Sequence, residues 1–284
     1  MESIASLLEA GSEVLRNAGI PDPRREASSL MEHAIGRRRA FILAHPEHVP
    51  GADEKSSYRE FIRRRSDREP FHYITGVKEF FGLEFSVSPA VLIPRPETEI
   101  LVEGAILRLS GREKPRFCEV GVGSGCISIA LLANLPAVEA VGLEISPDAI
   151  CIARSNSIKH GVASRLDLRE SNVFEALGHG EKFDVIVSNP PYVPAADIGG
   201  LQPEVRDFEP HQALTDQMDG MSIIRRLVHE APAFLNREGT LMFEFGFAQG
   251  EQVRGAFSPE IWTELTFQDD LQGIPRIAAA ILAK

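Results

Sequence analysis

From residue 116 onward, short apolar runs alternate along the chain with segments of helical periodicity. Each run is typical of a buried strand, and strands that alternate with helices predict a mainly parallel sheet with helices on both faces. The linker between the last two runs, around Asp269–Gly273, is too short for a helical crossover, so we expect an antiparallel hairpin there. The expected fold class is therefore α/β, with seven strands at residues 116–120, 138–144, 165–170, 183–188, 239–245, 261–267 and 275–282.

The first quarter of the chain is helical in its periodicity. Helices are expected over residues 3–18, about 38–45 and about 53–68, and a fourth begins after Asp22 and ends before Gly36. Four short amphipathic helices predict a small bundle. From residue 80 apolar and polar side chains alternate, which predicts a β-hairpin over about 76–94. The expected organisation is a helical bundle, a hairpin linker and an α/β domain, with bounds 1–75, 76–98 and 99–284.

The net charge of −11 disfavours a protein that binds nucleic acid stably, because phosphate binding depends on clustered Lys and Arg. Two local basic runs, Arg37–Arg39 and Arg63–Arg65, lie in the helical quarter. A solvated helix face is the preferred interpretation of both runs. The alternative is a docking surface for an acidic or ribonucleoprotein partner.

Composition also bears on metals, membranes and compartment. Three irregularly spaced cysteines predict neither a disulfide framework nor a zinc site, and the eight histidines include no H-x-x-x-H pair, so no metal centre is expected. No apolar run is long enough to span a bilayer, and the N-terminus lacks the basic start and apolar core of a secretory signal. We expect a cytoplasmic protein with no membrane partner.

The first expected strand leads into a glycine-rich loop, Gly121-Val122-Gly123-Ser124-Gly125. Three glycines let the backbone approach a ligand closely and let the next helix pack tightly. Cys126 stands where the dinucleotide fingerprint needs a glycine, and Val122 stands where a nucleophile elbow centred on Ser124 needs one. The loop therefore favours neither a dehydrogenase nor a hydrolase.

The ends of the next two strands carry further candidate binding residues. Glu144 ends the second strand, where an acidic side chain accepts the ribose hydroxyls of an adenosine. Ser146 and Pro147 begin the following helix, which leaves Glu144 at the sheet edge. The third strand ends beside the expected adenine position, where Asn172 is a candidate to contact the base and Val173 to pack on it.

The fourth strand ends in the sequence Asn189-Pro190-Pro191-Tyr192. Proline fixes φ and removes an N–H, so the carbonyl groups of Asn189 and Pro190 face outward without ladder partners. With the Asn189 side chain they form a cluster of hydrogen-bond acceptors at the carboxyl edge of the sheet, where α/β folds bind ligands. An ordinary strand-ending turn is the alternative interpretation.

The glycine loop, the acidic strand end and N-P-P-Y together resemble the class I S-adenosylmethionine-dependent methyltransferases, which have a Rossmann-like fold. Other motifs make the chain resemble the release-factor glutamine methyltransferases (PrmC/HemK) over nearly its whole length: residues 69–76, 80–82, 92–99, 208–210, 213–214, 219–220 and 244–246. Glu119 and Glu144 stand where this family usually has Asp, and Asn172-Val173 replaces Asp followed by a larger residue.

The resemblance implies transfer of a methyl group from S-adenosylmethionine, giving S-adenosylhomocysteine, to the amide nitrogen N5 of the glutamine in the GGQ motif of peptide chain release factors. It implies that Asn189 and Pro190 accept the two amide N–H groups, that Pro191 and Tyr192 complete the substrate site, and that Tyr192 flanks the amide and excludes water. The implied cofactor residues are Gly121, Val122, Gly123, Ser124, Gly125, Glu144, Asn172, Val173 and Asn189. The long segment 193–219 predicts a lid or substrate-binding loop.

Three alternatives stay open from the sequence. A sister family with N-P-P-Y methylates a ribosomal-protein glutamine, and another group methylates exocyclic amines of nucleic acids by acting on a flipped base. The net charge disfavours the nucleic-acid enzyme. A non-catalytic, cofactor-binding partner subunit is disfavoured because such subunits commonly lose the glycines or the asparagine, and both are present here.

Overall fold

A computed structural model gives the structure of residues 2–284, and the chain separates into two compact units. The bundle unit consists of Met1–Val77 together with Gln202–Phe208. The sheet unit consists of Lys78–Leu201 together with Glu209–Lys284. Within the described residues no helix combines the length and the apolar composition that crossing a bilayer requires.

The bundle unit contains the four predicted helices and two more. Its helices are α1 (Ile4–Asn17), α2 (Pro23–Ile35), α3 (Arg39–Ala44), α4 (Ala52–Ser66), α5 (Phe71–Thr75) and α9 (Pro203–Phe208). Gly36 ends α2 in the left-handed conformation with φ 61°, as its position predicts. Asp22 precedes α2 but makes no side-chain cap.

A buried cluster of charges holds α9 on the bundle. The side chain of Arg65, which is 4% exposed, pairs with Glu26 at 2.5 Å and with Glu204 at 3.0 Å. Glu204 also pairs with Arg68 at 2.7 Å. Glu204 belongs to α9, so part of the long segment 193–219 is anchored in the bundle unit.

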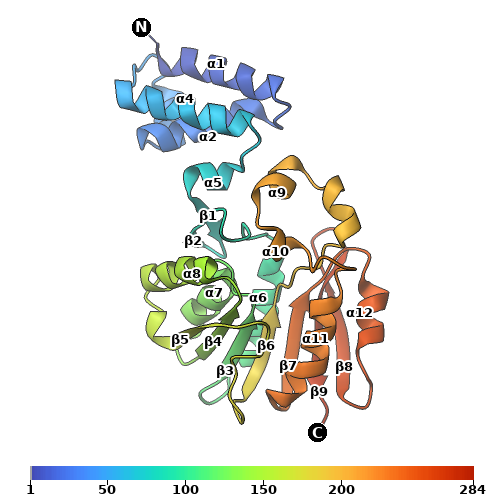
Figure 1. Cartoon of the computed structure of the whole chain (residues 1–284). Helices are drawn as coiled ribbons and strands as arrows, with labels where there is room; N and C mark the ends of the chain where they lie inside the picture. The colour runs from blue at the N-terminus through green and yellow to red at the C-terminus, as the bar shows by residue number, and fades with distance from the viewer. Residues whose placement is uncertain (1) are drawn as a thin grey trace. The chain divides into compact units, whose positions relative to one another are not determined.

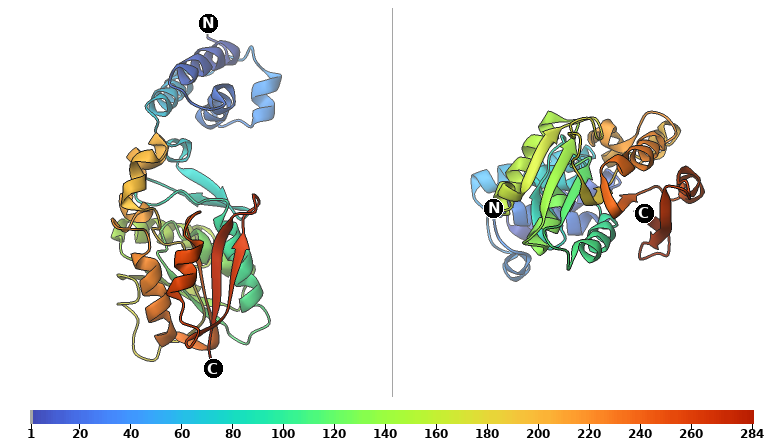
Figure 2. Two further views of the ribbon diagram at one scale, coloured as in Figure 1. Left: turned by 90° about the vertical axis from the view of Figure 1, so that its right-hand side faces the viewer. Right: turned by 90° about the horizontal axis from the view of Figure 1, so that it is seen from below.

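The sheet unit contains the seven predicted strands: β3 (Arg116–Val120), β4 (Glu139–Glu144), β5 (Leu166–Glu170), β6 (Phe183–Ser188), β7 (Leu235–Glu244), β8 (Trp262–Asp269) and β9 (Pro275–Leu282). Their order is β5-β4-β3-β6-β7-β9-β8. The first five are parallel, and β9 is antiparallel to both neighbours. The predicted terminal hairpin is confirmed, and the left view of Figure 2 shows it at the near edge of the sheet.

Helices cover both faces of this sheet, as the alternating pattern predicts. One face packs against α6 (Thr98–Leu109), α7 (Cys126–Asn134) and α8 (Pro147–Lys159). The other face packs against α11 (Ser222–Glu230) and α12 (Gly250–Ala256). Short 3-10 turns complete the unit at Ala163–Arg165, Ala195–Gly200 and Ala231–Ala233, and α10 is His211–Leu214.

The predicted hairpin is real but shorter than expected. Strand β1 (Val77–Phe80) pairs with β2 (Leu83–Ser86) in a sheet of their own, and Phe81 and Gly82 make the turn with φ of 53° and 74°. Residues 87–97 form no strand, because three prolines within them remove N–H donors. Helix α5 was not predicted, because five residues are too few to show a helical period.

Candidate active site

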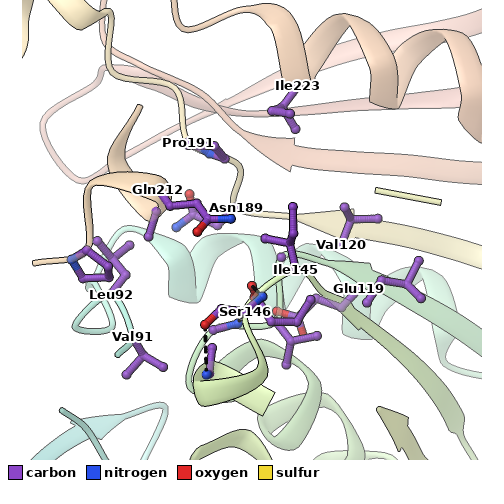
Figure 3. Close-up of a pocket in the computed structure, with 18 of the residues that line it drawn as sticks. Val91, Leu92, Glu119, Val120, Ile145, Ser146, Asn189, Pro191, Gln212 and Ile223 are labelled. Atoms are coloured by element: carbon purple, nitrogen blue, oxygen red, sulfur yellow. Dashed lines mark hydrogen bonds between the residues drawn. The ribbon is translucent and has the colours of Figure 1, made fainter. Parts of the chain in front are cut away.

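A cavity of about 350 Å³ lies in the sheet unit at the carboxyl ends of the parallel strands. One part of its wall, which we call the glycine-loop half, comes from Glu119–Ser124, Leu143–Ser146 and Ser171–Val173. The opposite part, the Asn189 half, contains Thr98, Asn189 and Pro191. Figure 3 shows Ser146 and Ile145 toward one end of the cavity and Asn189 and Pro191 toward the other.

The glycine loop needs its glycines for two different reasons. Gly121, Gly123 and Gly125 have φ of 78°, 54° and 83°, a region that side chains with a Cβ rarely adopt. A Cβ on Gly125 would also lie 2.9 Å from Cδ1 of Ile129 and 3.4 Å from Ala153. Gly125 therefore packs α7 against α8, and it is the one glycine of the predicted loop that does not line the cavity.

Glu144 holds the loop in place. Its side chain, 8% exposed, accepts the N–H of Gly123 at 2.9 Å through Oε2 and the N–H of Ser146 at 3.0 Å through Oε1. Ser146 caps α8 as predicted, accepting the N–H of Ala149. The carboxylate at the end of β4 thus faces the cavity with each oxygen using one lone pair.

Two buried polar atoms in the glycine-loop half have no hydrogen-bond partner within residues 2–284: Oε1 of Glu119 and Oγ of Ser124. Glu119 is fully buried at the end of β3, and its other oxygen accepts the backbone N–H of Ser128 at 2.9 Å and the hydroxyl of Ser128. Burial raises the pKa of Glu119 to about 8, and the nearby charge of Glu144 adds to the effect. Buried polar atoms without partners at a cavity wall indicate a ligand that supplies the missing bonds.

Sequence reasoning did not place Glu119 in the site. It noted only that Glu119 stands where related chains have Asp. The signal that could have found it was its position at the end of the strand that precedes the glycine loop.

Asn172 and Val173 both line the cavity, as predicted. Both ends of the Asn172 amide already have partners, Glu175 at 2.7 Å and Arg226 at 2.8 Å. Val173 is buried and has a φ of 55°, which turns the chain sharply at the end of β5. With the half-exposed Ile145, Val173 gives this end of the cavity an apolar wall.

In the Asn189 half, the asparagine leaves its oxygen atoms open. Its side-chain Nδ2 donates to the hydroxyl of Thr98 at 3.0 Å. Within residues 2–284 no hydrogen bond is described to its Oδ1, nor to the carbonyl oxygens of Asn189 and Pro190. Of the two residues predicted to supply acceptors, Asn189 lines the cavity and Pro190 does not.

The predicted position of Tyr192 differs from the one the structure gives. Neither Pro190 nor Tyr192 lines the cavity, whereas Pro191 does. The hydroxyl of Tyr192 donates to Glu244 at 2.8 Å. The ring of Tyr192 packs against the hydrophobic core between the sheet and helices α11 and α12. Burial and the neighbouring Glu244 raise the pKa of Tyr192, so the phenol stays protonated. A buried acceptor thus draws the ring away from the place where it was expected to flank a ligand.

The segments at residues 90–95 and 210–217 also line the cavity. Glu209, 3% exposed, accepts the N–H of Ile93 at 3.2 Å and the guanidinium of Arg95 at 2.6 Å, which ties the two segments together. Asp216 accepts three backbone N–H groups, those of Met218, Gly220 and Ser222. Part of the predicted substrate loop is therefore ordered beside the site.

Comparison with known proteins decides the family. A model described as the PrmC N-terminal domain matches residues 6–76, and one described as the methyltransferase small domain matches residues 98–199. The release factor glutamine methyltransferase of Geobacter sulfurreducens is 41% identical over 97% of this chain and 95% of its own length. That of Koribacter versatilis is 40% identical over 93% of this chain and 92% of its own. The chain belongs to the release factor glutamine methyltransferase family.

Solved structures agree on the fold. A methyltransferase from Pyrococcus furiosus is 16% identical, with a TM-score of 0.53 over 73% of this chain and 92% of that one. The hMettl16 catalytic domain in complex with a MAT2A 3′UTR hairpin is 14% identical, with a TM-score of 0.58 over 81% of this chain and 84% of that one. At such identities these similarities concern the fold alone.

Enzymes of this methyltransferase family use S-adenosylmethionine, and the glycine-loop half fits that molecule. The unpartnered Oε1 of Glu119 and Oγ of Ser124 suit the amino and carboxylate groups of its methionyl part. Glu144 suits its ribose hydroxyls, and the apolar wall of Ile145 and Val173 suits its base. The side chains of this half are therefore compatible with the cofactor.

Proposed function

We propose that this protein methylates the side-chain nitrogen N5 of the glutamine in the GGQ motif of peptide chain release factors. The observation that carries the proposal is the 41% identity over 97% of the chain with an enzyme named for that reaction. The open acceptor atoms of the Asn189 half support it, because an amide NH₂ group brings only hydrogen-bond donors.

Bound S-adenosylmethionine supplies an electrophilic methyl group on a sulfonium. An amide nitrogen is a poor nucleophile because its lone pair is delocalised into the carbonyl group. Oδ1 of Asn189 and the carbonyl oxygen of Pro190 accept its two N–H groups, fix its rotation and stabilise the positive charge that develops on it. Positioning of this kind supplies much of the acceleration, so no strong general base is needed before transfer. The methyl–sulfur bond breaks as the nitrogen–methyl bond forms, and the nitrogen then loses one of its two protons.

The glycine-loop half binds and orients the methyl donor. Glu119 and Ser124 hold the methionyl end, Glu144 holds the ribose, and Val173 packs on the base. Asn172, whose amide is paired with Glu175 and Arg226, lies beside the base. Residues 121–123 bring the backbone close to the ligand. Gly125 allows α7, which follows the loop, to pack closely against α8.

We also propose that residues 1–75 dock the protein substrate. The two basic runs of the bundle differ in a way that supports a docking role for one of them. Arg63 and Arg64 pair with acidic neighbours of the same unit, Glu60 and Glu69. Arg37–Arg39 are exposed and form no ion pair within the described residues, although Arg37 lies over the ring of Phe41 at 5.4 Å and the charge of Arg39 acts on Glu32. Their positive charges are exposed to an acidic surface. The expected compartment is the cytoplasm, where release factors act.

The test uses the purified protein, S-adenosylmethionine labelled in its methyl group, and an intact release factor. We expect label in the natural factor and none in a factor whose GGQ glutamine is replaced by glutamate, which lacks the amide nitrogen. Equal labelling of both factors would refute the assignment of N5. Label that appears instead in ribosomal protein or in nucleic acid, offered in the same reaction, would establish one of the alternative substrates.

The docking role has its own measurement. Replacing Arg37, Arg38 and Arg39 by Glu should slow methylation of the intact release factor by about tenfold, because a steered charge contact is lost. The rate on a short glutamine peptide should stay unchanged. The same change at Arg24 and Arg25, which are also exposed, is the matched control. Equal losses on factor and peptide would exclude docking through this run.

A further inference from the structure

The end of N-P-P-Y is held by a buried hydrogen-bond relay that involves two residues outside the motif. Oγ1 of Thr98 accepts Nδ2 of Asn189 at 3.0 Å and donates its own proton to Oε2 of Glu244 at 2.6 Å. The other oxygen of Glu244 accepts the hydroxyl of Tyr192 at 2.8 Å. One carboxylate therefore fixes both ends of the tetrapeptide, directly at Tyr192 and through Thr98 at Asn189.

Burial raises the pKa of Glu244, and the hydrogen bonds that it accepts from Thr98 and Tyr192 oppose this shift. While Glu244 is ionised, the relay permits only one arrangement of protons. A carboxylate only accepts, so the single proton of the Thr98 hydroxyl goes to Glu244. The lone pair of Thr98 then accepts an N–H, which only the Nδ2 end of the Asn189 amide provides. If the amide were turned over, its oxygen would face the Thr98 oxygen, and its NH₂ group would face the cavity.

We infer that Thr98 and Glu244 are positioning residues, which set the Asn189 side chain so that its oxygen, and not its NH₂ group, faces the acceptor nitrogen. This inference rests on the proposed function. A turned Asn189 would present donors to a substrate group that also brings only donors. Because the relay turns the Asn189 oxygen toward the cavity, the cavity favours a substrate NH₂ group over a group that only accepts hydrogen bonds.

The burial of the relay argues against a role in packing alone. Thr98 and Glu244 are each 2% exposed, and Glu244 forms no ion pair within residues 2–284. A buried carboxylate without a cationic partner is costly, and a well-packed apolar side chain at the end of β7 would stabilise the sheet more. The carboxylate is useful because it accepts two hydroxyl protons at once and so sets the direction of both hydrogen bonds.

The three parts of the relay come from distant segments. Thr98 begins α6, Asn189 follows β6, and Glu244 ends β7. The Thr98–Glu244 bond joins residues 146 positions apart. Both belong to motifs, at 92–99 and 244–246, that the resemblance singled out without giving either residue a role.

The first test is Thr98→Val, which keeps the shape of the side chain and removes the hydroxyl. We expect kcat on the release factor to fall by about 10- to 100-fold, since Asn189 then turns freely, while the Kd for S-adenosylmethionine changes by less than about twofold. Thr98→Ser, which keeps the hydroxyl, should restore kcat to within about threefold of the natural protein. Thr240→Val, another 2% exposed threonine of the sheet unit that does not line the cavity, is the matched control and should leave kcat unchanged.

The second test separates the relay from a general structural effect. Glu244→Gln keeps the shape but cannot accept two hydroxyl protons equally, so kcat should fall by about tenfold. The double variant Thr98→Val/Glu244→Gln should be no slower than the slower single variant, because both changes break one relay. Thermal melting of every variant identifies any that is unfolded at the assay temperature, and if Thr98→Val is, Glu244→Gln with Thr98→Ser carries the test.

The outcomes distinguish this inference from the function on which it rests. If the natural protein does not label the release-factor glutamine, both are overturned. If it does, and Thr98→Val or Glu244→Gln has full kcat, the relay alone is overturned. Losses that multiply in the double variant would likewise refute a shared relay.

Discussion

The two halves of the cavity treat hydrogen bonding in opposite ways. The glycine-loop half leaves Oε1 of Glu119 and Oγ of Ser124 buried without partners. In the Asn189 half, the hydroxyl of Thr98 and one N–H of the Asn189 side chain are engaged, and no hydrogen bond to Oδ1 of Asn189 is described within residues 2–284. One half is incomplete until a ligand with both donors and acceptors arrives. The other is fixed beforehand and admits a group that only donates.

The difference follows from what each half has to recognise. An unpartnered buried polar atom costs about 1–3 kcal/mol, which binding of the methyl donor recovers. One molecule of the methyl donor binds in every turnover, so the free-energy cost of the unpartnered atoms is recovered each time. The acceptor amide is small and flat and has an oxygen that resembles its nitrogen in size. To distinguish the nitrogen of the amide from its oxygen, the Asn189 side chain has to keep one orientation when the substrate binds.

The largest effect is expected from Asn189→Ala, which removes the open acceptor of the Asn189 half. Transfer should slow by about 10²- to 10³-fold, because the amide loses its main positioning bond in the transition state. The affinity for S-adenosylmethionine, measured by calorimetry, should change by less than about twofold. The matched change Asn172→Ala in the other half should have the reverse pattern, weaker cofactor binding with nearly normal kcat. Full activity of Asn189→Ala would abolish the contrast between the halves.

A smaller effect is expected from Gly125→Ala, which disturbs the glycine loop from behind. The added Cβ would lie 2.9 Å from Ile129 at a φ of 83°, so the loop has to shift. We expect cofactor affinity to fall by about tenfold and stability by about 1–3 kcal/mol. Gly161→Ala is the matched control: φ there is 69° but no atom lies within 4 Å of the added Cβ, so it should lower stability by only about 1 kcal/mol and leave affinity intact. Equal affinity losses in the two variants would contradict the packing role of Gly125.

The smallest effect on transfer is expected at Glu119, whose contribution is to the pH dependence of stability. Burial raises its pKa from 4.5 to about 8, so the folded protein holds a proton that the unfolded chain releases above pH 4.5. This contribution is complete below pH 4.5 and is lost as the pH rises toward 8, at about 1.4 kcal/mol per pH unit or less. In denaturant unfolding without cofactor, the natural protein should therefore lose more stability than Glu119→Gln between pH 6 and pH 7.5. Identical slopes would show that Glu119 is ionised in the empty cavity.

Local sequence patterns predict most of the fold. The seven strands and the terminal hairpin follow from apolar periodicity and linker length, which are properties of neighbouring residues. The insertion of β9 between β7 and β8 and the short helix α5 depend on tertiary packing, so they were not predicted.

The sequence predicted those residues of the candidate site whose position depends only on the strand that they follow. The glycine loop, Glu144 and Asn189 each lie at the end of a strand, and the edge of an α/β sheet predicts their neighbourhood. The bond between the hydroxyl of Tyr192 and Glu244, 52 residues away, was not predicted. A local sequence pattern cannot predict a hydrogen bond between residues so far apart in the chain. Burial of Glu119 likewise depends on strands that flank it on both sides.

The anchoring of α9 in the bundle unit determines how the two units can be separated by cleavage or truncation of the chain. The polypeptide passes between the two units three times, near Val77, between Leu201 and Gln202, and between Phe208 and Glu209. A single cleavage near Val77 therefore leaves the bundle attached through α9, whose Glu204 is paired with Arg65 and Arg68. A shortened chain that begins at residue 76 would keep α9 but lose both of its arginine partners. The boundary between the units is thus a property of the folded chain, and no single point in the sequence marks it.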